Sequence, residues 1–254
     1  MLPDPILVTP FGSIYMYGVM ISLGLICCFL LLWALCKKFN YSEKSVDFLT
    51  LNAFISIALG FLSAALFQAI YTYIDDPSQP FRFSGITFLG GLIGGAGCFL
   101  IIFFIFKKKH NINLIEFLPI ASVCIVIAHA FGRVGCFFAG CCYGKATDSW
   151  LGVKFPNLEY KVLPTNLFEA IFLFILLGIL ILLFVKKVYK YNFPIYLISY
   201  GIWRFFIEFF RGDFRGTFIL GISPSQFWSI VMCAIGISLI FFIKYKTKNN
   251  NDAI

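Results

Sequence analysis

The sequence predicts an all-α fold, a polytopic transmembrane bundle of about seven helices. Its 254 residues are 60% hydrophobic and only 13% charged, whereas soluble domains are about 25% charged. A membrane-spanning helix needs roughly 20 apolar residues, and lipid cannot satisfy exposed backbone groups, so helices are the default for such runs. Seven apolar runs follow one another along the chain: Met16–Cys36, Phe48–Ile74, Ile86–Phe106, Leu114–Phe131, Leu167–Val185, Phe193–Phe210 and Phe227–Ile243.

The runs indicate one integral-membrane domain, residues 1–254, without a soluble domain, linker or internal repeat. We expect a small extracytoplasmic segment at about 133–165, where the chain leaves the membrane after the fourth run. Met1–Pro10 has no Lys or Arg before the first run, which predicts a retained helix rather than a cleaved signal peptide. The polar tail Lys244–Asp252 is expected to be frayed.

The lysines predict the orientation of the helices. Basic residues near helix ends favour the cytoplasm, and 12 of the 20 follow the odd-numbered runs. This places the N-terminus outside and the C-terminus in the cytoplasm. The net charge of +8 therefore reflects the membrane orientation of the helices, and we expect no nucleic-acid partner. The twelve are Lys37, Lys38, Lys44, Lys107, Lys108, Lys109, Lys186, Lys187, Lys190, Lys244, Lys246 and Lys248.

All arginines lie outside these clusters. The planar guanidinium group suits phosphate, which topology alone would not require. Arg204, Glu208 and Arg211 have i, i+4, i+7 spacing, which predicts one helix face. A charge inside a spanning helix costs roughly 2.5–3.5 kcal/mol on insertion scales and normally faces a partner or a wet cavity. The sequence therefore indicates an anion site, the alternative being an ion pair that holds helices together.

A second cluster begins at the end of the fourth run. His129 is one helical turn before Arg133, so both side chains are expected on one face; a histidine that only packs between helices is the alternative. Glycines follow at short intervals and allow a close backbone approach to a ligand. They are Gly132, Gly135, Gly140 and Gly144.

Three of the nine cysteines, Cys136, Cys141 and Cys142, crowd into the same segment. Outside the cytoplasm disulfides can form, and Cys136 could pair with either of the others, whereas adjacent cysteines would be strained. A zinc site is a further interpretation, but the spacing is not C-x₂-C and no second ligand pair follows. We therefore expect no metal and no cofactor.

Polar residues also gather at the predicted outer ends of the runs: Tyr15, Tyr17, Gln68, Asn166, Glu169, Ser225 and Gln226. Anchoring at the membrane interface explains the two tyrosines. It explains the clustering of the amides and acids on one side less well.

Short motifs occur in a fixed order: Tyr17-Gly18, Gly90-Gly91-Leu92-Ile93-Gly94, Gly132-Arg133-x-Gly-x-Phe ending at Tyr143-Gly144, Pro164-Thr165-Asn166-Leu167-Phe168-Glu169, Arg204-x-x-x-Glu208-x-x-Arg211 and Ser225-Gln226. In this order and topology the chain resembles bacterial prolipoprotein diacylglyceryl transferases over nearly its whole length. The resemblance implies a transferase of lipoprotein biosynthesis, multi-pass in the bacterial inner (cytoplasmic) membrane. It would move the diacylglyceryl group of phosphatidylglycerol to the lipobox cysteine thiol of a prolipoprotein and release glycerol phosphate.

The partners implied are phosphatidylglycerol, the prolipoprotein signal-peptide region and membrane lipids. Carried over by motif, Arg133 and Arg204 would be catalytic and hold the leaving phosphate. Glu208 and Arg211 would orient them. Substrate-binding residues would be Tyr17, Gly132, Gly135, Gly144, Asn166, Glu169, Glu208, Arg211 and Gln226.

Four positions depart from the family's usual residues. Leu89 and Leu163 stand where the family usually has His, Cys136 where it has Asn, and Cys141 where it has Glu. The acceptor must become a thiolate to attack. We hypothesise that His129 serves as the catalytic proton acceptor; the alternative is that Arg133 lowers the pKa of the acceptor thiol directly.

These departures leave two other functions open. One is a membrane transferase on the same scaffold with a different acceptor. The other is a non-catalytic lipid-binding or transport protein, since charges inside a membrane also mark transporters. The second is disfavoured because the sequence has no inverted repeat and no paired broken helices.

Overall fold

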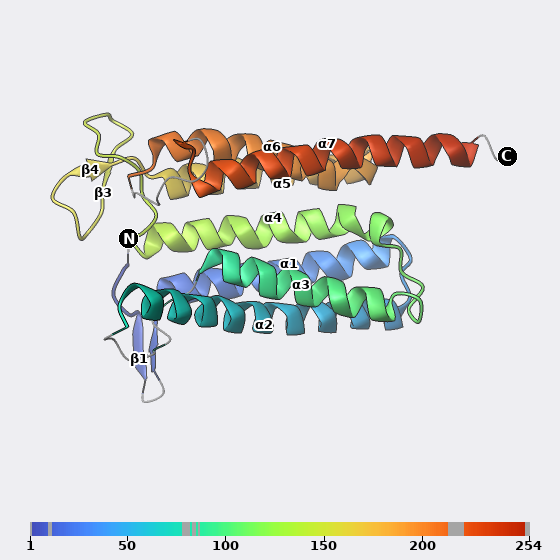
Figure 1. Ribbon diagram of the computed structural model, residues 1–254, viewed down its shortest axis with the longest axis horizontal. Coiled ribbons are helices and arrows are strands. Elements are labelled where there is room, and N and C mark those ends of the chain that lie inside the picture. The colour runs from blue at the N-terminus through green and yellow to red at the C-terminus, as the bar shows by residue number, and fades with distance from the viewer. Residues whose placement is uncertain are drawn as a thin grey trace. The chain divides into compact units, whose positions relative to one another are not determined.

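The computed structural model describes residues 2–9, 12–77, 82, 85, 87–212 and 221–251. Within these residues the chain forms seven α-helices, as predicted, and five are long and apolar enough to span a membrane. The protein is a multi-pass membrane protein. Ile86, which begins the third predicted run, and Asp252, which ends the predicted polar tail, lie outside the described residues, as does one of the arginines, Arg215. The helices are α1 (Met16–Lys38), α2 (Glu43–Asp75), α3 (Phe88–Phe106), α4 (Leu114–Phe138), α5 (Thr165–Val185), α6 (Asn192–Ile207) and α7 (Pro224–Asn251) (Figure 1).

Two helices extend well beyond the C-terminal ends of their apolar runs. Helix α4 continues almost two turns beyond Phe131, so Arg133 is inside the helix, and the chain turns only at Gly140 (φ 69°). Helix α7 continues through the polar tail to Asn251, where a frayed end was expected. Helical hydrogen bonds join backbone groups, so apolar side chains are not needed to extend a helix.

The end of α6 corrects the expected single helix face. Helix α6 ends at Ile207, a 3₁₀ turn (η2, Glu208–Phe210) follows, and Arg211 is extended with φ −74° and ψ 144°. A 3₁₀ turn tightens the last turn of many helices. Arg204 and Glu208 therefore keep helical spacing, whereas Arg211 reaches Glu208 from extended backbone.

The chain divides into two compact units. In the unit Trp33–Leu114, helices α2 and α3 run side by side in opposite directions (Figure 1). Ser63 Oγ donates a hydrogen bond to the Gly90 carbonyl (2.9 Å), and Asn52 Nδ2 donates to the Phe99 carbonyl (3.2 Å). Small residues and interhelical hydrogen bonds are what holds helices together in lipid.

The other unit contains Met1–Leu32 and Ile115–Ile254, with helices α4 to α7 and most of α1. Gly135 of α4 packs against Tyr17 of α1, and Gly201 of α6 packs against Cys233 of α7. Asn192 Nδ2 at the start of α6 donates to the Leu180 carbonyl of α5 (3.1 Å). Small residues and backbone-directed amides therefore also join these helices.

Two short hairpins lie outside the helices. Strand β1 (Leu7–Thr9) pairs antiparallel with β2 (Gly12–Ile14), and β3 (Val153–Lys154) pairs antiparallel with β4 (Lys161–Val162). The β3–β4 hairpin lies at the end of the unit where α4 ends and α5 begins (Figure 1).

An isolated bridge, Gly144↔Arg211, ties the loop after α4 to the end of α6. Gly144 N also donates to the Leu163 carbonyl (2.7 Å). The Phe210 carbonyl lies so close to Gly144 that an added Cβ would approach it to 2.5 Å. Glycine at this position therefore lets the α4–α5 loop, the start of α5 and the end of α6 meet.

Candidate active site

A buried carboxylate links three helices. Glu169 of α5 is 1% exposed. Its Oε1 lies 3.1 Å from Arg133 Nε and 3.7 Å from His129 Nε2 of α4, and it accepts a hydrogen bond from Tyr200 Oη of α6 (2.7 Å). Its Oε2 lies 4.0 Å from Arg204 Nη1, also of α6. Glu169 therefore organises both the half-buried Arg133 and the buried Arg204.

Helical spacing explains how these groups meet. His129 and Arg133 are one turn apart in α4, and Tyr200 and Arg204 are one turn apart in α6, so each pair projects from one helix face. Arg133 Nε also donates to His129 Nε2 (3.3 Å). In this arrangement Nε2 of His129 is a hydrogen-bond acceptor and carries no proton.

A second carboxylate continues the network. Glu208 Oε2 lies 2.8 Å from Arg204 Nη2 and 4.0 Å from Arg211 Nε. Arg204 Nη2 donates to Ser225 Oγ (2.9 Å), and Ser223 Oγ donates to Glu208 Oε1 (3.0 Å). Arg204 therefore lies between the two carboxylates.

Among the described residues of this network, guanidinium groups outnumber carboxylates. Three guanidinium groups, of Arg133, Arg204 and Arg211, meet two carboxylates, of Glu169 and Glu208. Within the described part of the chain, Arg204 Nη1 is buried without a hydrogen-bond acceptor. A buried donor without a partner is costly, and an anion would satisfy both the donor and the charge.

The start of α5 holds the cysteine-rich loop. Asn166 Nδ2 donates to the Cys141 carbonyl (2.8 Å), and Thr165 Oγ1 donates to the Cys142 carbonyl (3.1 Å). The thiol sulfurs of Cys136, Cys141 and Cys142 lie within 4.8 Å of one another, and all three cysteines are free. Hydrogen bonds from the Cys136 and Cys141 thiols hold the pKa of the Cys142 thiol below its ordinary value.

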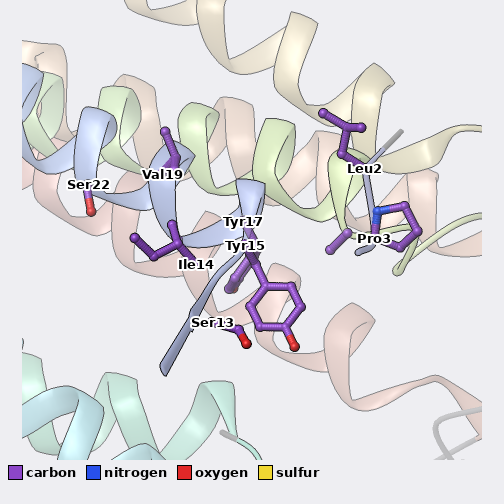
Figure 2. A pocket seen from close by; sticks show the side chains of 10 residues that line it. Leu2, Pro3, Ser13, Ile14, Tyr15, Tyr17, Val19 and Ser22 are labelled. Carbon is purple, nitrogen blue, oxygen red and sulfur yellow. The ribbon is translucent and has the colours of Figure 1, made fainter. Parts of the chain in front are cut away.

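A pocket of about 540 Å³ opens beside this loop. Figure 2 shows Tyr15 and Tyr17 among its lining side chains, with Leu2 and Pro3 from the N-terminal segment. Ala139, at the end of the helix that carries Cys136, also lines it, and Leu2 N donates to the Phe138 carbonyl (3.1 Å). The pocket wall is therefore attached to the end of α4.

Comparison with known proteins identifies the family. The model of a family described as prolipoprotein diacylglyceryl transferase matches residues 5–242. The chain belongs to this family. It is 36% identical over 242 residues to the phosphatidylglycerol–prolipoprotein diacylglyceryl transferase of Clostridium tetani, covering 92% of this chain and 95% of the relative.

Two further relatives carry similar names. The phosphatidylglycerol–prolipoprotein diacylglyceryl transferase 2 of Clostridium perfringens is 36% identical over 243 residues, covering 92% of this chain and 93% of the relative. The Clostridioides difficile transferase is 32% identical over 259 residues, covering 97% and 98%. The resemblance noted from short motifs is therefore confirmed.

The structure brings most of the predicted site residues together. His129, Arg133, Glu169, Arg204, Glu208 and Arg211 form the ionic network described above. Gln226 joins its edge, because Gln226 Oε1 accepts a hydrogen bond from Ser223 N (2.9 Å).

The remaining predicted residues lie around this network. Asn166 and Gly144 shape the cysteine-rich loop, and Tyr17 lines the pocket and packs on Gly135. Gly132 lies in α4, and a Cβ added to it would meet nothing within 4 Å among the described residues. Close packing against these residues therefore does not require glycine at this position.

Three contributors were not predicted: Tyr200, Thr165 and Ser223. Tyr200 is i−4 from Arg204 and could have been found from helical spacing. Thr165 and Ser223 act through tertiary contacts, for which the sequence has no local signal.

Proposed function

We propose that the protein transfers the diacylglyceryl group of phosphatidylglycerol to the lipobox cysteine thiol of prolipoproteins and releases glycerol phosphate. The observation that carries the proposal is the buried Arg204 Nη1, which lies 4.0 Å from Glu169 Oε2 and has no hydrogen-bond acceptor among the described residues. Its setting is the bacterial cytoplasmic membrane, with the N-terminus outside as the lysine clusters indicate. Family membership and the names of the relatives support the same reaction.

The reaction makes a particular electrostatic demand. The acceptor sulfur attacks the glycerol carbon next to the phosphate, the C–O bond breaks, and negative charge gathers on the phosphate oxygens. Preorganised donors in a site shielded from water stabilise such charge strongly. Arg133 and Arg204 are the proposed catalytic groups that hold this phosphate.

Other network members position these arginines. Glu169 and Glu208 orient the guanidinium groups through the ion pairs described, and Arg211 adds positive charge. Tyr17, Gly132, Gly135, Gly144, Asn166 and Gln226 are proposed to shape the substrate pocket and its loop.

His129 remains a hypothesis as the proton acceptor. Its Nε2 accepts a hydrogen bond from Arg133, so it must release that bond before it can take a proton. His129→Ala should abolish transfer if His129 is the base. His129→Gln, which can still accept from Arg133 through its amide oxygen, should restore activity only if the role is to position Arg133.

The direct test is an assay with phosphatidylglycerol labelled in its acyl chains and a lipobox peptide. The wild type should form a labelled thioether lipopeptide. Arg133→Lys, which keeps the charge opposite Glu169, should lower turnover by at least about 100-fold with an unchanged elution profile in detergent. Arg82→Lys is the matched control, because Arg82 is exposed and outside the network.

Absence of any thioether product from the wild type would contradict the proposal. Turnover of phosphatidylglycerol without thioether would instead favour a different acceptor, the alternative that Cys136 and Cys141 motivate by standing where the family usually has Asn and Glu.

A further inference from the structure

The strongest unexplained feature is the convergence of three thiols. Cys136 lies in the last turn of α4, and Cys141 and Cys142 follow the turn at Gly140. Left-handed backbone at Gly140 (φ 69°) and at Cys142 (φ 59°) folds the chain back on the helix end. Left-handed φ is uncommon for a cysteine, so tertiary contacts must hold this conformation.

The contacts that hold the loop are made mainly to its backbone, and the Cys141 thiol makes a weak hydrogen bond within the loop itself, from Cys141 Sγ to the Cys136 carbonyl (3.6 Å). Asn166 and Thr165 bind only the backbone carbonyls of Cys141 and Cys142, and Cys141 N donates to the Cys136 carbonyl (3.1 Å). The side chains thus converge from a backbone that is anchored on two sides. Among the described residues, no His, Asp or Glu completes the group.

The spacing of the sulfurs fits a thiophilic cation. Tetrahedral Zn²⁺ with Zn–S bonds of about 2.3 Å holds its sulfurs about 3.8 Å apart. The observed sulfurs lie within 4.8 Å of one another. Side-chain rotations that move the sulfurs by about 1 Å would bring them to the separation that Zn²⁺ requires. Thiolate ligands select Zn²⁺ over Mg²⁺ or Ca²⁺.

The surroundings fit the charge of such a site. Three thiolates and one Zn²⁺ carry a net charge of −1, and the guanidinium groups of Arg133 and Arg211 are near enough to interact electrostatically with Cys142. Tyr17, which lines the pocket, is near enough to all three cysteines to interact with them electrostatically.

We propose that Cys136, Cys141 and Cys142 bind one Zn²⁺ whose fourth position takes the thiol of the acceptor cysteine. Structural zinc sites have four protein ligands, whereas catalytic sites have three and an open position, and the described residues supply three. The acceptor role rests on the proposed transferase function.

The step balances without a redox partner. The acceptor thiol loses its proton to water as its sulfur binds Zn²⁺, because coordination deprotonates a thiol. The bound sulfur then donates an electron pair to the glycerol carbon, the C–O bond breaks, and the phosphate leaves with that bond's electron pair. The thioether product is a weak ligand and dissociates. In this scheme His129 positions Arg133 rather than acting as the base.

The first experiment measures metal in the purified full-length protein in detergent. Wild type loaded with ZnCl₂ and then desalted should retain about one Zn²⁺ per chain. Cys136→Ser, Cys141→Ser and Cys142→Ser should each lower this to about a tenth or less. Cys98→Ser, a half-buried cysteine of α3 outside the cluster, should retain the wild-type amount.

The second experiment tests the open position. Co²⁺-loaded wild type should show thiolate-to-cobalt absorption, and this spectrum should change when a lipobox peptide is added but stay constant with the same peptide carrying Cys→Ser. A spectrum insensitive to both peptides would overturn the acceptor role and indicate a purely structural metal.

Other outcomes overturn the proposal while leaving the transferase reaction untouched. These are a wild type that forms labelled thioether but retains no metal, cysteine variants with full activity, and a disulfide between Cys136 and either neighbour in the isolated protein. Metal bound at the three cysteines without any thioether product would instead sink the proposed reaction, so the two failures are distinguishable.

Discussion

Helices α2 and α3 and helices α4 to α6 are made of similar apolar sequence, yet they bury different polar groups. Between α2 and α3 the hydrogen-bonding side chains are neutral: the buried Asn52 and the half-buried Ser63 bond to backbone carbonyls of the neighbouring helix, and Ser56 bonds to Asn52. Among α4 to α6 they are charged, and Glu169 joins arginines from two helices.

The difference between these polar groups distinguishes side chains that hold helices together from side chains suited to bind a ligand. Neutral side chains and small residues are enough to hold two helices together in lipid. Charges inside the membrane are expensive and are not needed for packing. A charged network in which a buried arginine nitrogen lacks a hydrogen-bond acceptor among the described residues therefore points to an anionic ligand. Substitutions between α2 and α3 should therefore affect stability alone, whereas those among α4 to α6 should affect activity first.

The largest effect is expected from Glu169→Ala. It leaves Arg133 and Arg204 without their shared carboxylate, and removing one partner of a buried ion pair costs about 3–5 kcal/mol. Transfer should be abolished, and the denaturant midpoint in detergent should fall. Glu169→Gln, which still accepts from Tyr200, should recover much of the stability but little activity. Wild-type stability and turnover in Glu169→Ala would disprove the central role of this residue.

A smaller effect on folding but a large one on turnover is expected from Arg204→Lys. The guanidinium spans Glu169, Glu208 and Ser225 at once, and an ammonium cannot reproduce this planar fork. We expect kcat/KM to fall by about 100-fold, with little change in the unfolding midpoint. If the lysine variant keeps half of the wild-type kcat/KM, the geometry of the guanidinium is not what the reaction needs.

The smallest effect on catalysis is expected from Gly94→Ala in α3. A Cβ at this position would collide with the Ser63 side chain of α2, and such overpacking costs about 1–3 kcal/mol. Thermal unfolding in detergent should shift downward, while activity per folded molecule stays at the wild-type value. Gly97→Ala in the same helix is the control, because nothing described lies within 4 Å of its Cβ position; it should be neutral or slightly stabilising. Equal effects of the two changes would rule out close packing at Gly94.

The sequence by itself determined the seven helices and the arginine pairs with helical spacing. Run length predicts spanning helices because lipid leaves the backbone few alternatives. The spacing of His129 and Arg133, and of Arg204 and Glu208, predicts shared faces because an α-helix repeats every 3.6 residues. Both pairs are in contact in the structure.

Only the tertiary structure decided that Glu169 lies at the centre of the site and that three thiols converge. Glu169 meets Tyr200 from 31 positions away, and Asn166 holds Cys141 from 25 positions away. No local period encodes contacts at such separations. The short hairpins and the extended Arg211 were not predicted for a related reason. Strands of two or three residues and a single 3₁₀ turn are too short to show a sequence pattern. Their conformation depends on pairing with backbone segments elsewhere in the chain.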